Sequence, residues 1–396
     1  MAISTLVLGS QFLAYQSLPE DRNQLATLMI LFFIYVANTF LGSQIAKFPG
    51  GKAPGYSLTV TMTIIGTILT LVLVARTGYA RTSLVIGVAL IFFIKYFAYL
   101  ISKRFRHLKL AVVPYGITQK DTTSSNIHWR TLVSPSFQGC RFDGVIVDMD
   151  TDLPPEWVRF ISHASISGIP VINARKVQEE LGGKVDLDTL RTSDLESLQP
   201  SPAYLSMKRV IDTVVVIALS PLIIPVCLMV ALLVKLDSKG PILFVQKRVG
   251  QGNRVFSMYK FRSMREESLS AEPRFADTDS HRITKFGSII RKYRLDELPQ
   301  LFNVLKGDMS LIGPRPEQSG FVEQFEKDVP FYSYRHIVHP GITGWAQVSH
   351  GYAVCTESTK EKVEHDFYYI KNLSIGLDVL IIFKTIKTIL TGFGAK

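Results

Sequence analysis

Charged residues are scarce in this chain. Asp, Glu, Lys and Arg make up 19% of its 396 residues, whereas a soluble protein usually carries about a quarter. Hydrophobic residues reach 47%, and the length allows two or three domains. The shortage of charge argues against an ordinary soluble enzyme and indicates membrane segments.

Cysteines are few, and nucleic-acid-binding signatures are missing. The three cysteines, Cys140, Cys227 and Cys355, are far apart and odd in number, so neither a disulfide framework nor a zinc spacing is present. This pattern fits a reducing compartment. The net charge is +11, but no basic run is interleaved with aromatics, so we expect no nucleic-acid partner. Anionic lipid headgroups and a phosphorylated substrate explain the charge better.

Long apolar runs occupy the first hundred residues. Residues 23–46 and 53–75 are uncharged, and residues 82–102 are apolar except for Lys95. Each run reaches the roughly 20 residues that a membrane-spanning helix needs. Residues 2–19 form a marginal fourth run, broken by polar residues, and they lack the features of a removable signal peptide. We therefore expect three or four transmembrane helices in residues 1–103.

The run ends at a basic cluster, SKRFRHLK, over residues 102–109. Lys and Arg concentrate on the cytoplasmic side of membrane spans, so the rest of the chain is expected in the cytoplasm. Four spans would place the N-terminus inside and three would place it outside. The charges of the connecting loops do not decide between these topologies.

Residues 104–201 have the pattern of a small α/β domain. Strand-like residues 142–149, a helical stretch at 154–168 and strand-like residues 169–173 follow one another, which is typical of a parallel, Rossmann-like sheet. A dinucleotide-binding version would carry G-x-G-x-x-G after the first strand. Residues 112–121, VVPYGITQKD, contain one glycine. We therefore interpret this domain as structural or regulatory rather than catalytic, and we expect the catalytic domain in residues 202–396.

A further apolar run, residues 213–234, has basic residues on both flanks. Both ends thus favour the cytoplasmic face. Ser220-Pro221 and Pro225 interrupt it, and proline kinks a helix. These features predict a re-entrant hairpin that enters and leaves the membrane on one side, although a full crossing stays open as an alternative.

Two adjacent carboxylates, Asp296 and Glu297, stand in the stretch RLDELPQ, five residues after Arg291. A carboxylate can attack phosphorus as a nucleophile if cations neutralise the phosphate. Arg315, held between two prolines, offers a bidentate guanidinium. The alternative is that the two acids cap a helix and that Arg291 makes a surface salt bridge.

A glycine-rich and basic stretch, residues 240–264, precedes the acid pair and contains Lys260 and Arg262. Such a loop could accept phosphate. On its own this signal is weak.

From Lys208 to the C-terminus the chain resembles the bacterial sugar transferase family, the phosphoglycosyl transferases with a monotopic catalytic domain. The resemblance lies in KRVID, the Ser220-Pro221 hairpin, QKRVGQGNRVFSMYKFRSM, LDELPQLFNVLKGDMSLIGPRPE, PGITGWAQV and DFYYIKNLSIGLDVLIIFKTI. It implies an α/β membrane protein with N-terminal transmembrane helices, a degenerate Rossmann-like domain and a C-terminal catalytic domain. The location implied is the bacterial inner membrane, with catalysis on the cytoplasmic face.

The resemblance also implies roles. Asp296 would attack the β-phosphate of a UDP-sugar and release UMP, and polyprenyl phosphate would then take the sugar phosphate. Glu297 would support the reaction, and Mg²⁺ would be the cofactor, held by the two acids. The residues expected to grip phosphate are Arg291, Arg315, Lys260 and Arg262.

One segment departs from the family pattern. Many members continue GWAQV with Asn-Gly-Arg, but residues 349–352 here are Ser-His-Gly-Tyr, which leaves the sugar in doubt. Glucose or galactose 1-phosphate is the family-based expectation, and a homodimer is plausible. The competing hypotheses are an inactive membrane scaffold or sensor of polysaccharide synthesis, and an NAD-dependent epimerase-like enzyme that the missing glycines oppose.

Overall fold

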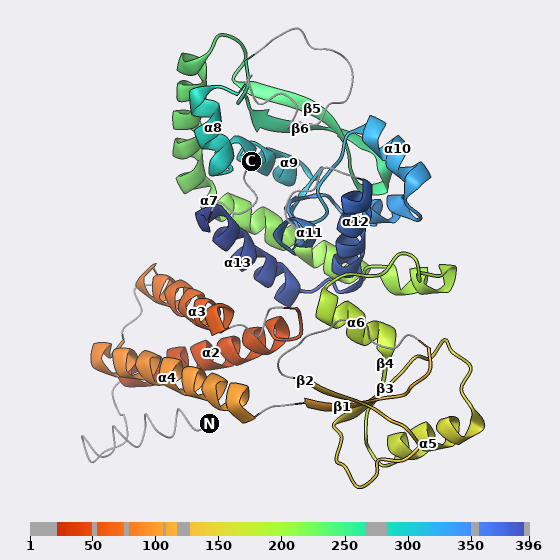
Figure 1. Ribbon diagram of the computed structural model, residues 1–396. Helices are drawn as coiled ribbons and strands as arrows, with labels where there is room; N and C mark the ends of the chain where they lie inside the picture. Colours follow the sequence, from red (N-terminus) through yellow and green to blue (C-terminus); the bar gives the residue numbers. More distant parts are fainter. Residues whose placement is uncertain are drawn as a thin grey trace. The chain divides into compact units, whose positions relative to one another are not determined.

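The computed structural model describes residues 22–49, 54–74, 79–105, 108–116, 127–265, 283–349 and 356–391. The chain divides into two compact units, Met1–Gly182 and Gly183–Lys396. Figure 1 shows a helical bundle and a small sheet in the first unit, and a mostly helical second unit.

Three apolar helices open the first unit. They are α2 (Arg22–Ile45), α3 (Pro54–Val74) and α4 (Arg81–Phe105). Residues Asn23–Ile45 and Arg81–Ile101 are long and apolar enough to cross a membrane, and α3 contributes a shorter apolar stretch, Thr59–Thr70. The three expected runs are thus helical, whereas residues 2–19 lie outside the described residues.

The bundle packs around a small apolar core. Its buried residues are Leu31, Ile34, Ile65, Leu84 and Ile91. The hydroxyl of Thr27, near the start of α2, accepts from the N–H of Ala80 at the start of α4. Farther along, the Lys95 ammonium donates to the Thr39 hydroxyl. Helices α2 and α4 therefore run parallel, with their C-terminal ends on the same side.

The sheet of the first unit has four parallel strands in the order β2-β1-β3-β4. The strand, helix and strand expected after residue 142 are β3, α5 and β4, and β2 is an additional edge strand. The bounds of these elements are β1 Leu108–Val112, β2 Ile127–Thr131, β3 Gly144–Val147, α5 Pro155–Ile166, β4 Val171–Asn173 and α6 Ala174–Gly182.

Side chains of the sheet alternate between two cores, as the two-residue period of a strand requires. Ala111 and Val145 pack with Trp157 of α5. Leu110 and Ile146 pack with Ala174 at the start of α6. The two helices thus cover opposite faces of the sheet, which explains why its central strands are apolar throughout.

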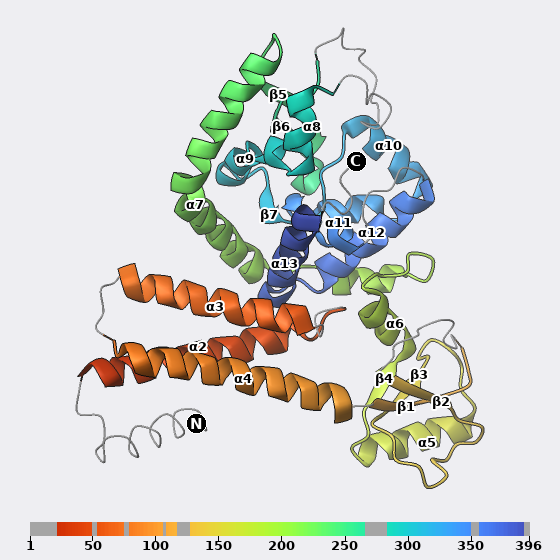
Figure 2. The same ribbon diagram turned by 60° about the vertical axis from the view of Figure 1, so that its left-hand side comes forward.

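The second unit is built on one long helix, α7 (Pro202–Asp237), which contains Pro221 and Pro225. Proline lacks an N–H, so Pro221 cannot bond the carbonyl four residues earlier. The Ser220 hydroxyl donates to that carbonyl, of Ile217, at 2.7 Å instead. Figures 1 and 2 show the helix bent along its length, which agrees with a proline-induced kink.

Both halves of α7 pack against the same unit. Val216 lies in a core with Met258 and Val304, whereas Val230 and Val234 lie in a core with Phe261 and Ile290. The outer face of the helix remains apolar and exposed. Its exposed side chains include Val210, Val214, Ile217, Leu222, Ile224, Leu228, Leu232 and Leu236.

The remaining elements surround α7. An antiparallel hairpin and a short parallel pair, β5-β6 and β7-β8, are its sheets. The bounds are β5 Leu243–Val249, β6 Val255–Phe261, α8 Lys285–Lys292, α9 Gln300–Lys306, β7 Ser310–Ile312, α10 Ser319–Asp328, β8 Gly341–Thr343, α11 Trp345–Ser349, α12 Thr356–Lys371 and α13 Ile375–Thr391.

The segment before α7 belongs to the second unit. It runs from Gly183 through a short 3₁₀ helix, Thr192–Leu198. The Gly183 carbonyl accepts from the Trp345 indole at 2.6 Å and lies 2.8 Å from the His365 ring nitrogen. Val185 bonds the Glu364 carbonyl. Trp345 is thus a packing residue, and the compact second unit begins before residue 202.

Candidate active site

The acid pair stands where the chain turns between α8 and α9. Arg294 has φ of 58° and ψ of 20°, a left-handed conformation, and a short 3₁₀ helix, Leu295–Glu297, follows it. A non-glycine residue in this region is uncommon and marks a sharp change of direction. Leu295 and Leu298 pack against the apolar core beside α7, so the leucines fix the turn that presents the acids.

Glu297 lies at the centre of a cluster of cations. Its Oε1 is 2.8 Å from Arg315 Nη2, 3.4 Å from Lys260 Nζ and 3.8 Å from Arg294 Nη1. The carboxylate is 6% exposed. Burying an ionised carboxylate is costly unless opposite charges pair with it, and here three cations do so.

Asp296 is buried beside Glu297 but is bonded differently. Its side chain is 9% exposed, and within the described part of the chain its Oδ1 has no hydrogen-bond partner. Buried polar atoms usually have a partner, so an exception calls for an explanation. A carboxylate oxygen that accepts no hydrogen bond and lies beside cations is suited to attack phosphorus or to coordinate a metal ion.

The pKa values of the two carboxyl groups are shifted in opposite directions. Burial and the neighbouring Glu297 charge raise the pKa of Asp296 to about 6. Burial opposes ionisation of Glu297 as well, but Arg315, Lys260 and Arg294 together hold the pKa of that carboxyl below its ordinary value. The physical basis is that nearby cations favour the charged form more than desolvation opposes it. Glu297 is therefore a fixed anion, and Asp296 is the group that can titrate.

Comparison with known proteins covers this site and the rest of the chain. The profile of the family described as bacterial sugar transferase matches residues 203–392. A UDP-N-acetylgalactosamine-undecaprenyl-phosphate N-acetylgalactosaminephosphotransferase of Aeromonas hydrophila is 44% identical over 377 residues, which is 95% of this chain and 89% of that protein.

The chain belongs to the bacterial sugar transferase family.

Other relatives match a smaller share of this chain. A UDP-glucose:undecaprenyl-phosphate glucose-1-phosphate transferase of Xanthomonas campestris is 38% identical over 57% of this chain and 43% of its own length. A transferase of the same description from Caulobacter vibrioides is 37% identical over 54% of this chain and 79% of its own length. The chain is therefore an enzyme of the sugar transferase family, and its apolar helices make it a membrane protein.

The transferase site contains some of the predicted phosphate-binding residues and not others. Arg315 and Lys260 contact Glu297, as described above. Arg262 is buried and donates to the carbonyl of Ser238 at 2.6 Å and to its hydroxyl at 2.9 Å, at the end of α7. Arg291 lies half-buried on α8, and the ion pairs of the described residues to Glu297 do not include it.

Arg294 is the site residue that the sequence analysis missed. Arg291 looked better placed because a helical turn separates it from Asp296. The left-handed turn at Arg294 ends that register and brings Arg294 itself to Glu297. An arginine directly before Leu-Asp-Glu was visible in the sequence, but its backbone conformation was not.

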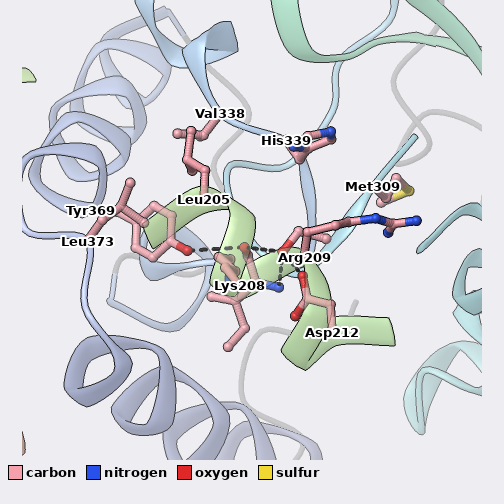
Figure 3. Close-up of a pocket in the computed structure, with 11 residues that line it drawn as sticks. Leu205, Lys208, Arg209, Asp212, Met309, Val338, His339, Tyr369 and Leu373 are labelled. Atoms are coloured by element: carbon pink, nitrogen blue, oxygen red, sulfur yellow. Dashed lines mark hydrogen bonds between the residues drawn. The ribbon is translucent and has the colours of Figure 1, made fainter. Parts of the chain in front are cut away.

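The KRVID motif lines a separate open pocket at the start of α7. Figure 3 shows Lys208, Arg209 and Asp212 on one helix, with Tyr369 opposite them. Lys208 is 2.6 Å from the Asp378 carboxylate, and Asp212 accepts from the Ser310 hydroxyl at 2.6 Å. These pairs tie α7 to α13 and to β7.

Arg209 has a different partner in the same motif. It donates to the carbonyls of Val304 and Leu305, the latter at 2.8 Å. The last carbonyls of a helix lack intrahelical partners, and α9 ends at Gly307 with φ of 96°. Arg209 thus provides hydrogen-bond donors for the last carbonyls of α9. The KRVID motif therefore joins α7 to its neighbouring elements.

Proposed function

We propose that this enzyme transfers a sugar 1-phosphate from a UDP-sugar to polyprenyl phosphate, giving a polyprenyl-diphosphate sugar and UMP. The observation that carries the proposal is the unbonded, buried Oδ1 of Asp296 beside Glu297 and its three cations. The activities for which the relatives are named, UDP-sugar:undecaprenyl-phosphate transfers, agree with it.

The proposed reaction has two displacements at one phosphorus. The Asp296 carboxylate attacks the β-phosphorus of the UDP-sugar, and the bond from that phosphorus to the bridging oxygen breaks, so that UMP leaves. An oxygen of polyprenyl phosphate then attacks the same phosphorus and breaks its bond to Asp296, which regenerates the carboxylate. A covalent intermediate divides one difficult step into two easier ones.

The charged residues around Asp296 have different electrostatic roles. Arg315, Lys260 and Arg294 supply positive charge for phosphate oxygens, and preorganised cations stabilise the charge that develops during phosphoryl transfer. Glu297 holds these three side chains together when no substrate is bound. Its negative charge also raises the pKa of Asp296, which makes that carboxylate a stronger base and nucleophile once ionised.

Asp296 and Glu297 together could bind a magnesium ion with help from the substrate. Among the described residues, no group of three or more His, Cys, Asp and Glu side chains could hold a metal by itself. Mg²⁺ usually binds through one or two carboxylates together with substrate phosphates and water. Asp296, with Glu297 beside it, would hold the ion, which would neutralise charge on the diphosphate.

The donor that we propose to test first is UDP-N-acetylgalactosamine. The relative that carries this specificity in its description aligns with 95% of the chain, whereas the Xanthomonas glucose transferase aligns with 57%. This choice differs from glucose or galactose, the expectation from the family alone. His350, in the segment that departs from the family pattern, lies outside the described residues.

The membrane arrangement is part of the proposal. Helix α7 has 36 residues and would be about 54 Å long if straight, yet both of its halves pack in cores of one unit. A helix bent at Ser220-Pro221 that enters and leaves on one side satisfies these contacts. The basic cluster after α4 supports a cytoplasmic location for that side, and the membrane of the proposal is the inner membrane of a bacterium. One relative is described as an exopolysaccharide production protein, and the product would enter that kind of pathway.

The deciding experiment traps the intermediate. Full-length protein in nanodiscs, given Mg²⁺ and UDP-N-acetylgalactosamine without polyprenyl phosphate, should release about one UMP per site and gain the mass of one sugar phosphate. The adduct should map to the peptide containing Asp296. Asp296→Asn should form no adduct and lose several powers of ten in turnover.

A panel of other UDP-sugars serves as the specificity control. Turnover without any adduct would favour direct transfer in a ternary complex, and an active Asp296→Asn enzyme would rule out the assigned nucleophile.

A further inference from the structure

The backbone around Arg315 is fixed by hydrogen bonds to its carbonyl groups. All four carbonyls from Pro314 to Glu317 accept a hydrogen bond. Their donors are, in order, the Gly341 N–H at 2.9 Å, Arg335 Nη2 at 2.9 Å, Arg248 Nη1 at 3.2 Å and the Val249 N–H at 2.9 Å.

The two prolines explain why carbonyls are used. Proline fixes φ and has no N–H, so Pro314 and Pro316 can be held through their carbonyls but not through donors of their own. With φ restricted and every carbonyl bonded, the segment has little freedom. The direction of the Arg315 side chain, which reaches Glu297 at 2.8 Å, is then set by the backbone beneath it.

The donor to the Arg315 carbonyl is a buried guanidinium. Arg335 is 2% exposed and Asp366 is 1% exposed, and their charged atoms are 2.7 Å apart. Arg335 also donates to the Tyr332 hydroxyl at 2.7 Å. A buried pair of this kind adds little net stability compared with apolar residues of similar size, so its presence calls for a role beyond stability.

We infer that the Arg335–Asp366 pair positions Arg315 for the transfer reaction. Asp366 orients Arg335, Arg335 holds the Arg315 carbonyl, and Arg315 projects its guanidinium to the acid pair. Arg335 contacts neither acid in this chain of bonds, so it is a positioning residue and acts through Arg315. The inference rests on the proposed function, because the value of a placed Arg315 depends on the phosphate chemistry at Asp296.

A second charged group supports the same segment. Glu317 Oε2 is 3.4 Å from Arg248, and its Oε1 is 2.5 Å from Lys362. Burial opposes its ionisation, but the surrounding cations Lys362, Arg335 and Arg248 lower its pKa to about 2. Arg248 is thereby kept beside the Pro316 carbonyl. Two side-chain donors, each with its own carboxylate, thus hold adjacent carbonyls of the segment.

The test separates positioning from simple structural support. Arg335→Met alone leaves Asp366 without its buried partner and should destabilise the enzyme. The double variant Arg335→Met/Asp366→Leu removes both charges, and such replacements are often neutral or stabilising. It should regain the thermal midpoint of the wild type but keep a kcat about tenfold to a hundredfold lower, because small misplacements of catalytic groups cost rates of that order.

The Arg315→Ala background makes the test specific. If the pair acts through Arg315, adding the double change to Arg315→Ala should cost less than about threefold more, since groups that act as a unit are not additive. Lys208→Met/Asp378→Leu removes another buried pair and should leave kcat within about threefold of the wild type. Full recovery of kcat in the Arg335→Met/Asp366→Leu enzyme, or full additivity with Arg315→Ala, overturns the inference.

Hydrogen–deuterium exchange gives a readout that needs no turnover. The amides of Arg315 and Glu317 should exchange faster in the double variant than in the wild type, while the control pair leaves them unchanged. Unchanged exchange of these amides overturns the inference by itself. A failed assay with every UDP-sugar, combined with faster exchange, would instead count against the proposed function and leave the positioning of Arg315 supported.

Discussion

The two units of this protein differ in the partners that they give to charged side chains. In the first unit, residues 22–120 contain no Asp or Glu. Lys95, inside a candidate membrane span, donates to the Thr39 hydroxyl at 2.8 Å and lies 5.2 Å from the centre of the Tyr35 ring. In the second unit, carboxylates such as Glu297 and Asp366 are buried and each is paired with a cation.

The difference separates residues that support folding from residues that support chemistry. In the sheet of the first unit, Asp148 is a buried carboxylate that accepts from the Asp150 N–H and the Thr151 hydroxyl, so it caps a local turn. In the second unit, the buried ion pairs of Glu297 and Arg335 converge on the site of Asp296. Buried pairs are costly to desolvate, and two of those in the second unit, Arg315–Glu297 and Arg335–Asp366, are joined through Arg315.

The largest difference in kcat is expected when one buried carboxylate in each unit is replaced by its amide in two separate variants. Glu297→Gln keeps the shape but leaves three cations without their anion, so we expect kcat to fall by at least about a hundredfold, as removal of one preorganised electrostatic group does elsewhere. Asp148→Asn keeps one oxygen that can accept from the Asp150 N–H, and its amide nitrogen can donate to the Thr151 hydroxyl that now donates to the second oxygen, so this variant should stay within about twofold of the wild type. Steady-state UMP release measures both. Equal losses in the two variants would remove the contrast between the units.

A smaller effect concerns pH. Because the pKa of Asp296 is raised to about 6 and the attacking form is the carboxylate, kcat/KM should be flat above pH 6 and fall about tenfold per pH unit below it. Glu297→Gln removes the anion that raises this pKa, so the acid limb should move to lower pH in that variant. Arg315→Ala removes a cation and should move it to higher pH. A pH–rate profile of each enzyme measures the shift, and limbs that do not move would contradict the assigned coupling.

The smallest effect is expected in the membrane bundle. Lys95→Leu removes a charge from an apolar span at the loss of one hydrogen bond, so the bundle should gain about 1–2 kcal/mol of stability. Activity should not change. Thermal unfolding in nanodiscs measures the gain, with Lys47→Leu, at the end of α2, as the control for general loss of charge. A loss of stability or activity would show that the Lys95 ammonium has a partner that the helices do not supply.

Sequence patterns predicted much of the fold because the features concerned are local. The apolar runs, the strands at residues 144–147 and 171–173, and the helix between them follow from hydrophobic periodicity. The edge strand β2 was missed because IHWRT alternates weakly, with intermediate and exposed positions. The bent α7 was expected from its prolines, although its membrane path stays a prediction.

The site was predictable in its chemistry and less so in its geometry. The adjacent acids, Lys260 and Arg315 were found from residue type and from the family resemblance. The contact of Arg294 with Glu297 depends on one positive φ angle, and the contact of Arg262 with Ser238 depends on where α7 ends. The role of Arg291 in binding phosphate stays a prediction. The bonds from Arg335 and Arg248 to successive carbonyls join segments distant in sequence, and no local pattern indicates such pairings.

The junction at the start of α7 has a consequence for how the protein is made. Lys208 and its partner Asp378 are separated by 170 residues. At roughly 5–20 residues per second, Asp378 leaves the ribosome about 10–30 s after Lys208. During this interval the Lys208 ammonium lacks the carboxylate that pairs with it in the folded enzyme. The late arrival of α13 then closes the ion pair, so the start of α7 is joined to α13 only after nearly the whole chain has been made.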